Sequence, residues 1–540
     1  MEADFQSQTY ALQLREFIAE GSAPPSYESH PVVQRNAGRL VAPLGVYMDA
    51  LPYSLVDSVL GVWVINLVTG ARHVLLTIRK KRVCSCGCKG WCTYYVILLW
   101  IRWCIECMAS GVFPERRHDS TPFTDMHDEL RAAVAGSAMS MASAVLKLKG
   151  DWSEFCERFG FPNWRSGMRP CFCCNGFGPE LYSPVGVSLT SCPWHLNTDE
   201  DYERACAYCE IWVTVSREDH QRMLAVLHWD KRKDGARGRS LTVDLASFGL
   251  KKDDRLEPHP NLIDVAQFDH ISDFPCRVLF WRRSRETICT HRCPIFSRYL
   301  GVTQQCIAID ILHTLLLGPF LVWGRIAVWK LLLSGVWGAL EENNEARLKI
   351  AVTVLRTALH SWYTAEQSAG RFHSRIDVMT AKMIGTAASP TLKLKAMEAF
   401  GFVQFLVHSL QTYQVRGSED LVAAGNIMVQ LVELMKVSPA RLSAETTKQM
   451  LSLWKQHMAI MEIHEPFVPK HHLMFHCIMR SVFHGNPWLD ATFLDESLNK
   501  ELKQCCRYAH QTTFESTVIL KINLVLKRMQ VKRRMRSRPA

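Results

Sequence analysis

Short apolar runs separated by turns dominate the segment that begins at residue 41. The first run, VAPLGVYM, ends at Asp49, and the next two, SVLGVWVINL and ARHVLLTIRK, flank the turn Val68-Thr69-Gly70. Two β-rich runs around a glycine-containing turn are typical of a hairpin. The pattern therefore predicts three strands in an antiparallel meander.

Helical patterns follow the meander before a fourth apolar run. Residues 93–110 and part of 122–143 have the periodicity of helices, and AVLKLKG then leads directly into Asp151. Three antiparallel strands, a helical segment and a fourth strand that ends at a carboxylate follow the element order of the ribonuclease-H fold. We therefore expect a mixed α/β fold with a ribonuclease-H-like core.

Residues 305–465 lack the alternation of strands and are predicted to be helical. IDILHTLLLGPFLVWGRIAVWKLLL and NEARLKIAVTVLRTALHSWY are the clearest helical stretches. The apolar stretch 306–340 contains Asp310, His313, Arg325 and Lys330, whereas a spanning helix needs about 20 predominantly apolar residues. We therefore expect a long all-α insertion of buried helices, with its tryptophans in the core, and no membrane segment.

Composition and charge are those of a globular protein that can bind a polyanion. Hydrophobic residues make up 48% of the 540 residues and charged residues 21%, close to the average for soluble proteins. The net charge of +11 permits a nucleic-acid partner. The last residues, KRMQVKRRMRSRPA, are expected to be a solvated basic tail that can add phosphate contacts or act in nuclear import. The N-terminus lacks the pattern of a signal peptide.

Two aspartates stand where a phosphodiester-cleaving site would need carboxylates. Asp49 ends the first predicted strand and Asp151 follows the fourth. In-line displacement at phosphorus is promoted by two divalent ions about 3.5–4 Å apart, which carboxylates hold. Mg²⁺ prefers oxygen ligands and keeps several waters, so a few acids suffice. Each aspartate taken alone is better explained as a strand end, because Asp is common in turns.

Four blocks of sequence, in order, resemble the CACTA and Plavaka-type transposases. Lys149-Gly150-Asp151-Trp152, followed by RPCFCC, resembles the GD…PC-x2-C block of these families, and PLGVYMDALPY resembles their first-carboxylate strand. Asp310-Ile311-Leu312-His313 resembles their D-x2-H block. HHLMFHCIMRSVFHGNP and TFLDESLNKELK resemble their closing segment, in which an acidic residue and a lysine lie on a terminal helix. The resemblance spans roughly residues 40 to 525.

The resemblance implies a DNA transposase of the DDE type, which cuts and joins phosphodiesters with Mg²⁺ or Mn²⁺. It implies transposon ends and target DNA as partners, a homo-oligomer, and a nuclear location. Asp49 and Asp151 would be the first two catalytic carboxylates, and Glu496 the third. Glu398 is the alternative for the third acid, although a solvated helix face explains it better. Asp495 can also replace Glu496, because adjacent acids at a helix start favour the helix dipole.

Asp310 and His313 are three residues apart, so on a helix they face the same way. In the functional interpretation, His313 positions a metal-bound carboxylate, a phosphate or a neighbouring acid. A buried histidine bonded to its own helix neighbour is an equally good interpretation. A charged Asp310 in so apolar a run needs a partner in either case.

Paired cysteines and histidines predict structural zinc. Cys171-x2-Cys174 and Cys192-x2-His195, separated by 17 residues, have the spacing of a zinc site, and four protein ligands leave no open position. The pair Cys206 and Cys209 can replace one of these pairs or form a second site. The densest cluster, in CSCGCKGWC, can hold another zinc, with Cys104 and Cys107 as further ligands; it comprises Cys84, Cys86, Cys88 and Cys92. Buried free thiols are the alternative.

The predicted organisation places both insertions inside the catalytic core. The alternative to an active enzyme is a domesticated, catalytically inactive relative that binds nucleic acid and zinc. The short segment before Asp49 favours that alternative, because many relatives carry a DNA-binding module there. The expected parts are a linker over 1–38, the first part of the core over 39–165, a Cys/His-rich insertion over 166–300, a helical insertion over 301–470, the rest of the core over 471–525, and the basic tail over 526–540.

Overall fold

The computed structural model divides into two compact units. It describes residues 5, 8–84, 90–124, 128–161, 170–215, 256–258, 276–282, 292–338, 345–464 and 467–536. The unit that we call the sheet unit comprises residues 1–177, 195–308 and 494–540. The other, the helical unit, comprises residues 178–194 and 309–493.

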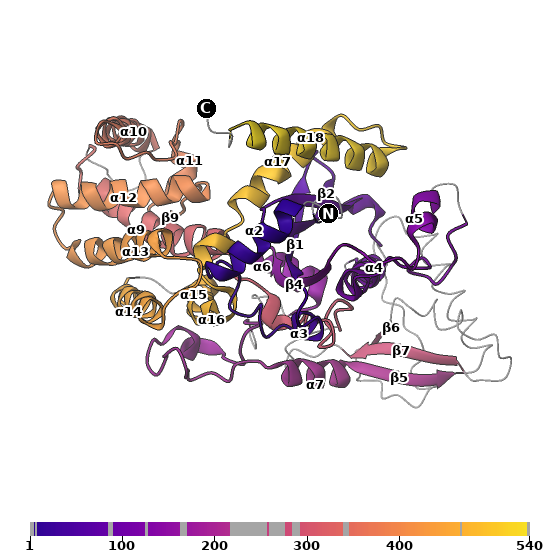
Figure 1. Cartoon of the computed structure of the whole chain (residues 1–540). Coiled ribbons are helices and arrows are strands. Elements are labelled where there is room, and N and C mark those ends of the chain that lie inside the picture. The colour runs from indigo at the N-terminus through magenta and orange to yellow at the C-terminus, as the bar shows by residue number, and fades with distance from the viewer. Residues whose placement is uncertain are drawn as a thin grey trace. The chain divides into compact units, whose positions relative to one another are not determined.

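A four-stranded mixed sheet forms the centre of the sheet unit (Figure 1). Strand β1 (Val41–Pro52) pairs antiparallel with β2 (Ser58–Asn66), which pairs antiparallel with β3 (Arg72–Arg79). Strand β4 (Ala142–Lys149) pairs parallel with β1, so the order is β3-β2-β1-β4. The predicted meander and the mixed α/β class are confirmed.

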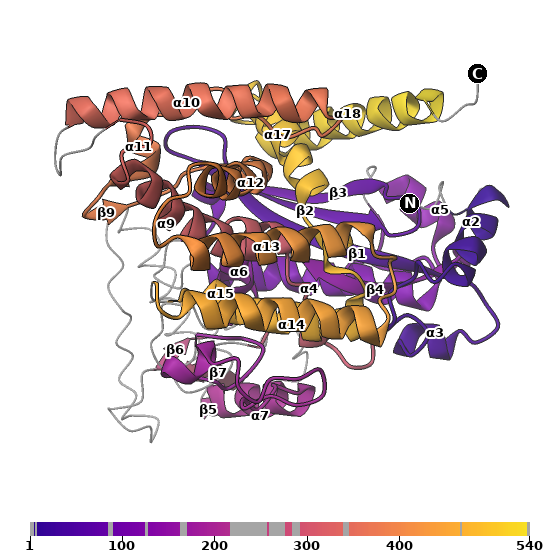
Figure 2. The ribbon, with the colours of Figure 1, turned by 90° about the vertical axis from the view of Figure 1, so that its left-hand side faces the viewer.

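Two C-terminal helices cover one face of this sheet. Alternate side chains of β1 and β2, including Tyr47 and Trp63, form a buried cluster with α17 (Phe493–Arg507) and α18 (Phe514–Arg536). The close packing needs a glycine at Gly61, because a Cβ there would lie 2.9 Å from Leu502 Cδ2. In Figure 2, α17 and α18 lie above the strands, while α4 (Trp91–Ser110) and α6 (Trp152–Phe159) lie below them.

The C-terminal tail is more ordered than the sequence predicts. Helix α18 continues to Arg536, so most of the expected basic tail is helical. Its first turn is attached to β3, because the buried Arg79 guanidinium binds both carboxylate oxygens of Glu515 at 2.8 and 2.9 Å. Arg79 also stacks over the Phe514 ring at 4.3 Å.

The expected linker over residues 1–38 instead contains helices α2 (Gln8–Ala19) and α3 (Pro31–Arg35). Tyr10 and Leu14 of α2 are buried, so this segment contributes to the core of the sheet unit. The His30 side chain caps α3 by accepting from Val32 N, and a proline at the first helical position favours that start.

The remaining elements of the sheet unit are shorter. They are η1 (Lys80–Arg82), α5 (Glu129–Val134), α7 (Asp199–Cys209), the strands β5 (Glu210–Val215), β6 (Leu256–Pro258) and β7 (Cys276–Arg282) in the order β5-β7-β6, and η7 (Gln304–Cys306). The helix expected within 122–143 is only α5, which ends where Gly136 adopts φ +71°. After η7 the chain runs beside β4, where Leu148 forms a parallel bridge with Ile307.

The helical unit confirms the prediction of a mostly α-helical region. It contains η3 (Gly178–Tyr182), η8 (Leu312–Leu316), α9 (Pro319–Leu333), α10 (Glu345–Ser368), α11 (Ala381–Ile384), α12 (Ala396–Thr412), α13 (Glu419–Val437), α14 (Ala444–Met461), α15 (Pro469–Met479), α16 (Ser481–His484) and η9 (Pro487–Asp490). A two-residue pairing of β8 (Gly385–Thr386) with β9 (Ser389–Pro390) is an exception to the predicted pattern.

The most apolar stretch of the helical unit, residues 312–333, belongs to its core. By length and composition, residues 312–333 could cross a membrane. However, 72% of the apolar 18-residue stretch within them is buried inside the fold. Trp323 and Trp329 are buried as predicted, and their indole N–H groups donate to Leu421 O and Ile384 O. The stretch therefore has the properties of a core helix.

Candidate functional site

Asp49 lies within β1 and is held by two neighbours in the sheet unit. The Tyr47 hydroxyl donates to Asp49 Oδ2 at 3.0 Å, and Asn499 Nδ2 of α17 donates to the same oxygen at 2.5 Å. Asn499 Nδ2 also donates to the Tyr47 hydroxyl oxygen at 2.9 Å. Burial and the charges of Asp49, Glu496 and Asp495 raise the pKa of Tyr47 well above its usual value, so this hydroxyl keeps its proton.

Asp151 follows β4 and begins α6. Its Oδ1 accepts from Glu154 N at 2.8 Å and from the Ser153 hydroxyl at 2.7 Å, which is the geometry of a helix N-cap. The parallel pairing of β1 with β4 ends at Tyr47 opposite Lys149, and Asp49 and Asp151 each lie two residues further on. Both aspartates therefore lie just beyond the same end of the β1–β4 pairing. The first strand does not end at Asp49 as predicted, because β1 stays paired with β2 as far as Pro52.

The glycine of the KGDW block allows this approach. A Cβ on Gly150 would lie 2.9 Å from the backbone oxygen of Met48, closer than side-chain carbons normally come. Any larger residue would push the start of α6 away from β1. Gly150 therefore allows close contact with the backbone of β1, and Asp151 places a carboxylate next to that contact.

Glu154 is a further acid in this region, and no sequence motif points to it. Its side chain is buried in the first turn of α6, and Arg158 Nε lies 3.2 Å from Glu154 Oε2. Burial raises the pKa of Glu154 to about 7, Arg158 lowers it, and the charges of Asp49 and Asp151 raise it further. Three carboxyl groups therefore interact electrostatically at this end of the sheet.

The two adjacent acids of α17 have different surroundings. Asp495 is buried and paired with two cations: Lys149 Nζ lies 2.7 Å from Oδ2, and Arg72 Nε lies 2.6 Å from Oδ1. Glu496 is half-buried, and its negative charge contributes to the raised pKa of Tyr47. Since both oxygens of Asp495 are engaged by cations, Glu496 is the better candidate for binding a metal ion.

These acids share one region, but they are not packed as a ready-made metal site. Among the described residues, Asp49, Asp151 and Glu496 do not form a group whose ligand atoms all lie within 4.8 Å of one another. The region supplies carboxylate oxygens, which are the ligands that Mg²⁺ prefers. A cation would have to draw the carboxylates closer together.

Asp310 and His313 interact with each other in the helical unit. Asp310 is buried just before η8 and accepts from His313 Nδ1 at 2.5 Å and from Leu312 N at 3.0 Å. It also accepts from the Thr492 hydroxyl at 2.8 Å and from Thr492 N at 3.0 Å. The expectation that both residues lie on a regular helix is corrected, because Asp310 precedes the π-helical turn Leu312–Leu316 that contains His313, and accepts from backbone amides of that turn. Thr492 immediately precedes α17.

The alternative third acid, Glu398, lies in the first turn of α12. Its carboxylate accepts from Lys395 N at 3.0 Å and pairs with Lys395 Nζ at 2.9 Å. This is the capping arrangement of a helix start, in which the Lys395 side chain is exposed and the Glu398 side chain is 14% exposed. The geometry therefore supports the helix-face interpretation of Glu398.

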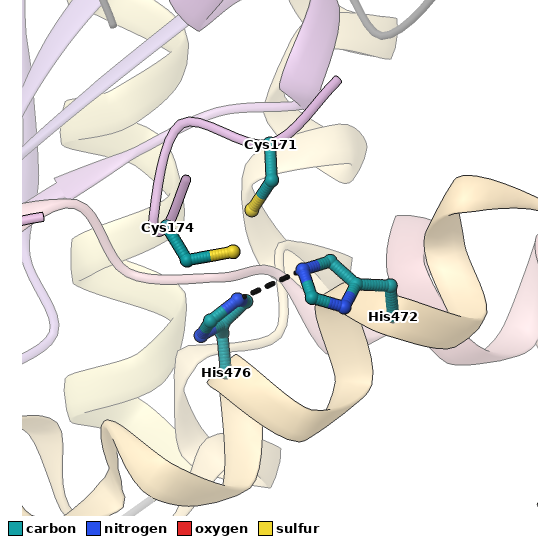
Figure 3. Close-up of side chains that lie close together, drawn as sticks. All are labelled: Cys171, Cys174, His472 and His476. Carbon is teal, nitrogen blue, oxygen red and sulfur yellow. Dashed lines mark hydrogen bonds between the residues drawn. The ribbon is translucent and has the colours of Figure 1, made fainter. Parts of the chain in front are cut away.

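A compact cluster of metal-ligating side chains lies elsewhere (Figure 3). Cys171 and Cys174 point toward His472 and His476 of α15, and one ligand atom from each lies within 4.8 Å of the others. All four residues are buried. The two histidines are four apart on α15 and so share one helix face. This buried Cys2His2 cluster can hold a zinc ion.

The hydrogen bonds around the cluster suit zinc. His472 Nδ1 lies 2.8 Å from Leu181 O, so it carries the proton and leaves the lone pair on Nε2. His476 Nε2 lies 3.0 Å from His472 Nε2, near the spacing of about 3.3 Å that two nitrogens have around tetrahedral zinc. Burial lowers the pKa of His476 well below its usual value, which keeps its imidazole neutral.

Backbone amides support the two sulfur ligands. Cys173 N lies 3.3 Å from Cys171 Sγ, and Gly176 N lies 3.4 Å from Cys174 Sγ. Each amide donates to the sulfur two residues earlier in the chain. Charge-assisted hydrogen bonds of this kind stabilise thiolates, which are the form that binds metal.

The predicted partners of Cys171 and Cys174 are wrong. Cys192 Sγ donates to Trp194 O at 2.9 Å, and the exposed His195 pairs with Asp201 at 2.7 Å. The pair that the structure brings to Cys171 and Cys174, His472-x3-His476, has the spacing of a zinc-ligand pair and stands in the HHLMFHC segment. Sequence spacing favours the nearer pair, because the histidines follow about 300 residues later in the chain.

The other predicted zinc ligands form no such group among the described residues. Cys206 and Cys209 are buried on α7 and belong to no cluster of three ligands there. Cys84 has its backbone N bonded to Thr93 Oγ1. Cys86 and Cys88, and the side chain of Cys92, lie outside the described residues.

Cys104 and Cys107 on α4 have the properties of thiols. Burial raises the pKa of Cys104 to about 12 and that of Cys107 to about 11. Neither belongs to a ligand cluster in the described part of the chain.

Comparison of the chain with protein-family models, with curated proteins and with solved structures gave no match.

Proposed function

We propose that the protein is a DNA transposase-type enzyme with a ribonuclease-H-like core, which cuts and joins phosphodiesters by a two-metal mechanism. The observation that carries the proposal is the parallel register of β1 and β4, in which Tyr47 pairs with Lys149. Asp49 and Asp151 therefore lie just beyond the same end of this pairing, on or directly after strands β1 and β4, which are neighbours in the order β3-β2-β1-β4. That order and those positions are the ones that the fold and its chemistry require.

Asp49, Asp151 and Glu496 would hold Mg²⁺ or Mn²⁺, which activates the attacking oxygen and stabilises the leaving oxygen. Asp49 contributes from β1, where its backbone is paired with Gly61 of β2. Asp151 contributes from the rigid start of α6, because its N-cap bonds fix the side chain. Glu496 approaches from α17, whose first turn Asp495 anchors to the sheet. In the first step the nucleophile is water, and in the second it is a DNA 3′-hydroxyl.

The Cys2His2 cluster would bind a structural zinc ion in this enzyme. Four protein ligands leave no open position for substrate, so the zinc has no direct part in the chemistry. Asp310 would act at a distance from the reacting atoms, by holding the residue that precedes α17 through its two bonds to Thr492.

DNA would be bound as transposon ends and target, in the nucleus, by a homo-oligomer. The net charge of +11 supports a polyanionic partner. The end of α18 adds a run of basic residues, KRMQVKRRMR, with no acid among them. Contacts of this kind make binding salt-dependent, because each neutralised phosphate releases counterions.

The proposal is tested by nicking of supercoiled plasmid DNA with Mg²⁺ or Mn²⁺ as the only divalent ion. Wild-type protein is expected to nick, and Glu496→Gln to lose at least about a hundredfold in rate, since metal-ion catalysis contributes several kcal/mol. Glu398→Gln is the matched control, because the Glu398 carboxylate is engaged by the backbone N and Nζ of Lys395 at the start of α12. Wild-type protein that binds DNA without nicking it would support the inactive alternative instead.

A further inference from the structure

Asn499 contacts both Asp49 and Tyr47. It lies on α17, and only 5% of its surface is exposed. Its Nδ2 donates to Asp49 Oδ2 and to the Tyr47 hydroxyl oxygen, while that hydroxyl donates to the same Asp49 oxygen. The three side chains thus form a closed triangle of hydrogen bonds.

The Asp49 carboxylate determines which groups act as donors in this triangle. The Tyr47 hydroxyl lies 3.0 Å from Asp49 Oδ2 and is the donor in this bond, because an ionised carboxylate oxygen can only accept. Asn499 supplies the second donor without adding a charge. Two donors on Oδ2 restrict rotation of the carboxylate and set the direction in which its other oxygen points.

Asn499 is poorly explained as a residue that stabilises the fold. Its Oδ1 is buried and has no hydrogen-bond partner among the described residues. A buried amide group left unsatisfied costs about 1–3 kcal/mol. The favourable contacts of this side chain are those directed at Tyr47 and Asp49.

Helix geometry connects Asn499 to the third acid. It follows Glu496 by three residues on α17, so the two side chains lie on neighbouring positions of one helix face. We propose that Asn499 is a positioning residue, which holds Asp49 through Oδ2 and thereby sets its orientation relative to Glu496. This inference rests on the proposed function, because it treats both acids as metal ligands.

The test is the affinity for Mn²⁺, measured from the free-ion signal in electron paramagnetic resonance. Asn499→Leu is expected to bind Mn²⁺ about 10–100-fold more weakly, as is typical when a residue that orients a metal ligand is lost. Gln504→Leu, at an exposed position of α17, makes the same polar-to-leucine change and is expected to bind like wild type. Tyr47→Phe removes only one oxygen and serves as a second variant if Asn499→Leu fails to fold.

The effects of Asn499→Leu and Tyr47→Phe on Mn²⁺ affinity are also expected to combine non-additively, because both substitutions remove parts of one hydrogen-bond network. Asn499→Leu protein that melts at a lower temperature but binds Mn²⁺ like wild type would overturn the positioning role. Asp49→Asn separates this result from failure of the proposed function. If wild type binds Mn²⁺ and Asp49→Asn does not, the acid site exists whatever Asn499 does. If Asp49→Asn binds like wild type, the proposed function fails, and the inference with it.

Discussion

Lys149 Nζ lies 2.7 Å from Asp495 Oδ2, although the two residues are 346 positions apart in the chain. Arg72 Nε approaches the other oxygen of the same carboxylate at 2.6 Å. A buried acid therefore ties the first turn of α17 to β4 on one side and to β3 on the other. Lys149 is two residues before Asp151 and Asp495 is directly before Glu496, so this contact sets the position of two proposed metal ligands.

Asp495→Asn is expected to destabilise the sheet unit by about 3–5 kcal/mol, because it leaves the buried cations Lys149 and Arg72 without their counter-charge. Urea unfolding at neutral pH measures the change. The control is Glu106→Gln, which removes an exposed pair with Arg102 and should cost at most about 1 kcal/mol. Equal effects of the two substitutions would contradict the assigned role of Asp495.

Zinc content tests the corrected ligand set. Wild-type protein is expected to carry one zinc at the cluster, and Cys171→Ser or His472→Ala to lose it, because tetrahedral sites need all four ligands. Metal analysis of purified protein gives the result directly. Cys192→Ser and His195→Ala make the same changes at the pair suggested by sequence spacing and should retain zinc. Loss of zinc from that second pair of variants would restore the original assignment.

Acid is expected to weaken the helical unit through His457. The side chain is fully buried, its Nδ1 donates to Ala424 O at 3.2 Å, and burial lowers its pKa to about 4 from the usual 6.5. As the pH falls from 6.5 towards 4, His457 becomes protonated in the unfolded chain but stays neutral in the folded chain. Stability present above pH 6.5 is therefore lost, by up to about 3 kcal/mol at this one site.

Thermal unfolding between pH 7 and 4 measures this dependence. His457→Gln keeps an amide donor for Ala424 O and should reduce the loss, whereas the exposed His408→Gln should not. Parallel curves for wild type and His457→Gln would show that His457 contributes nothing to the acid sensitivity. His471 is also buried, with its pKa lowered to about 3, so some dependence is expected to persist in the variant.

Local patterns predicted the strands and the place of Asp151, because alternation and turns are encoded in neighbouring residues. The same patterns could not distinguish Asp495 from Glu496, since that distinction depends on Lys149 and Arg72 arriving from distant strands. They also selected the wrong partners for Cys171 and Cys174. Spacing finds ligand pairs, such as His472-x3-His476, but only the fold determines which pairs meet.

Asn499 and Glu154 illustrate the same limit. No sequence pattern singles out either residue, since each appears in the sequence as one polar residue on an amphipathic helix. Their relevance comes from what the fold places against them: Asp49 next to Asn499, and both aspartates within electrostatic reach of Glu154.

The most direct measurement of the central claim is the rate of Mg²⁺-dependent nicking of supercoiled plasmid by Asp151→Asn protein. Asparagine is as good an N-cap as aspartate, so the substitution removes the metal-binding charge while α6 keeps its start. The account predicts that nicking seen with wild type falls by at least about a hundredfold. Nicking by Asp151→Asn at the wild-type rate would contradict it.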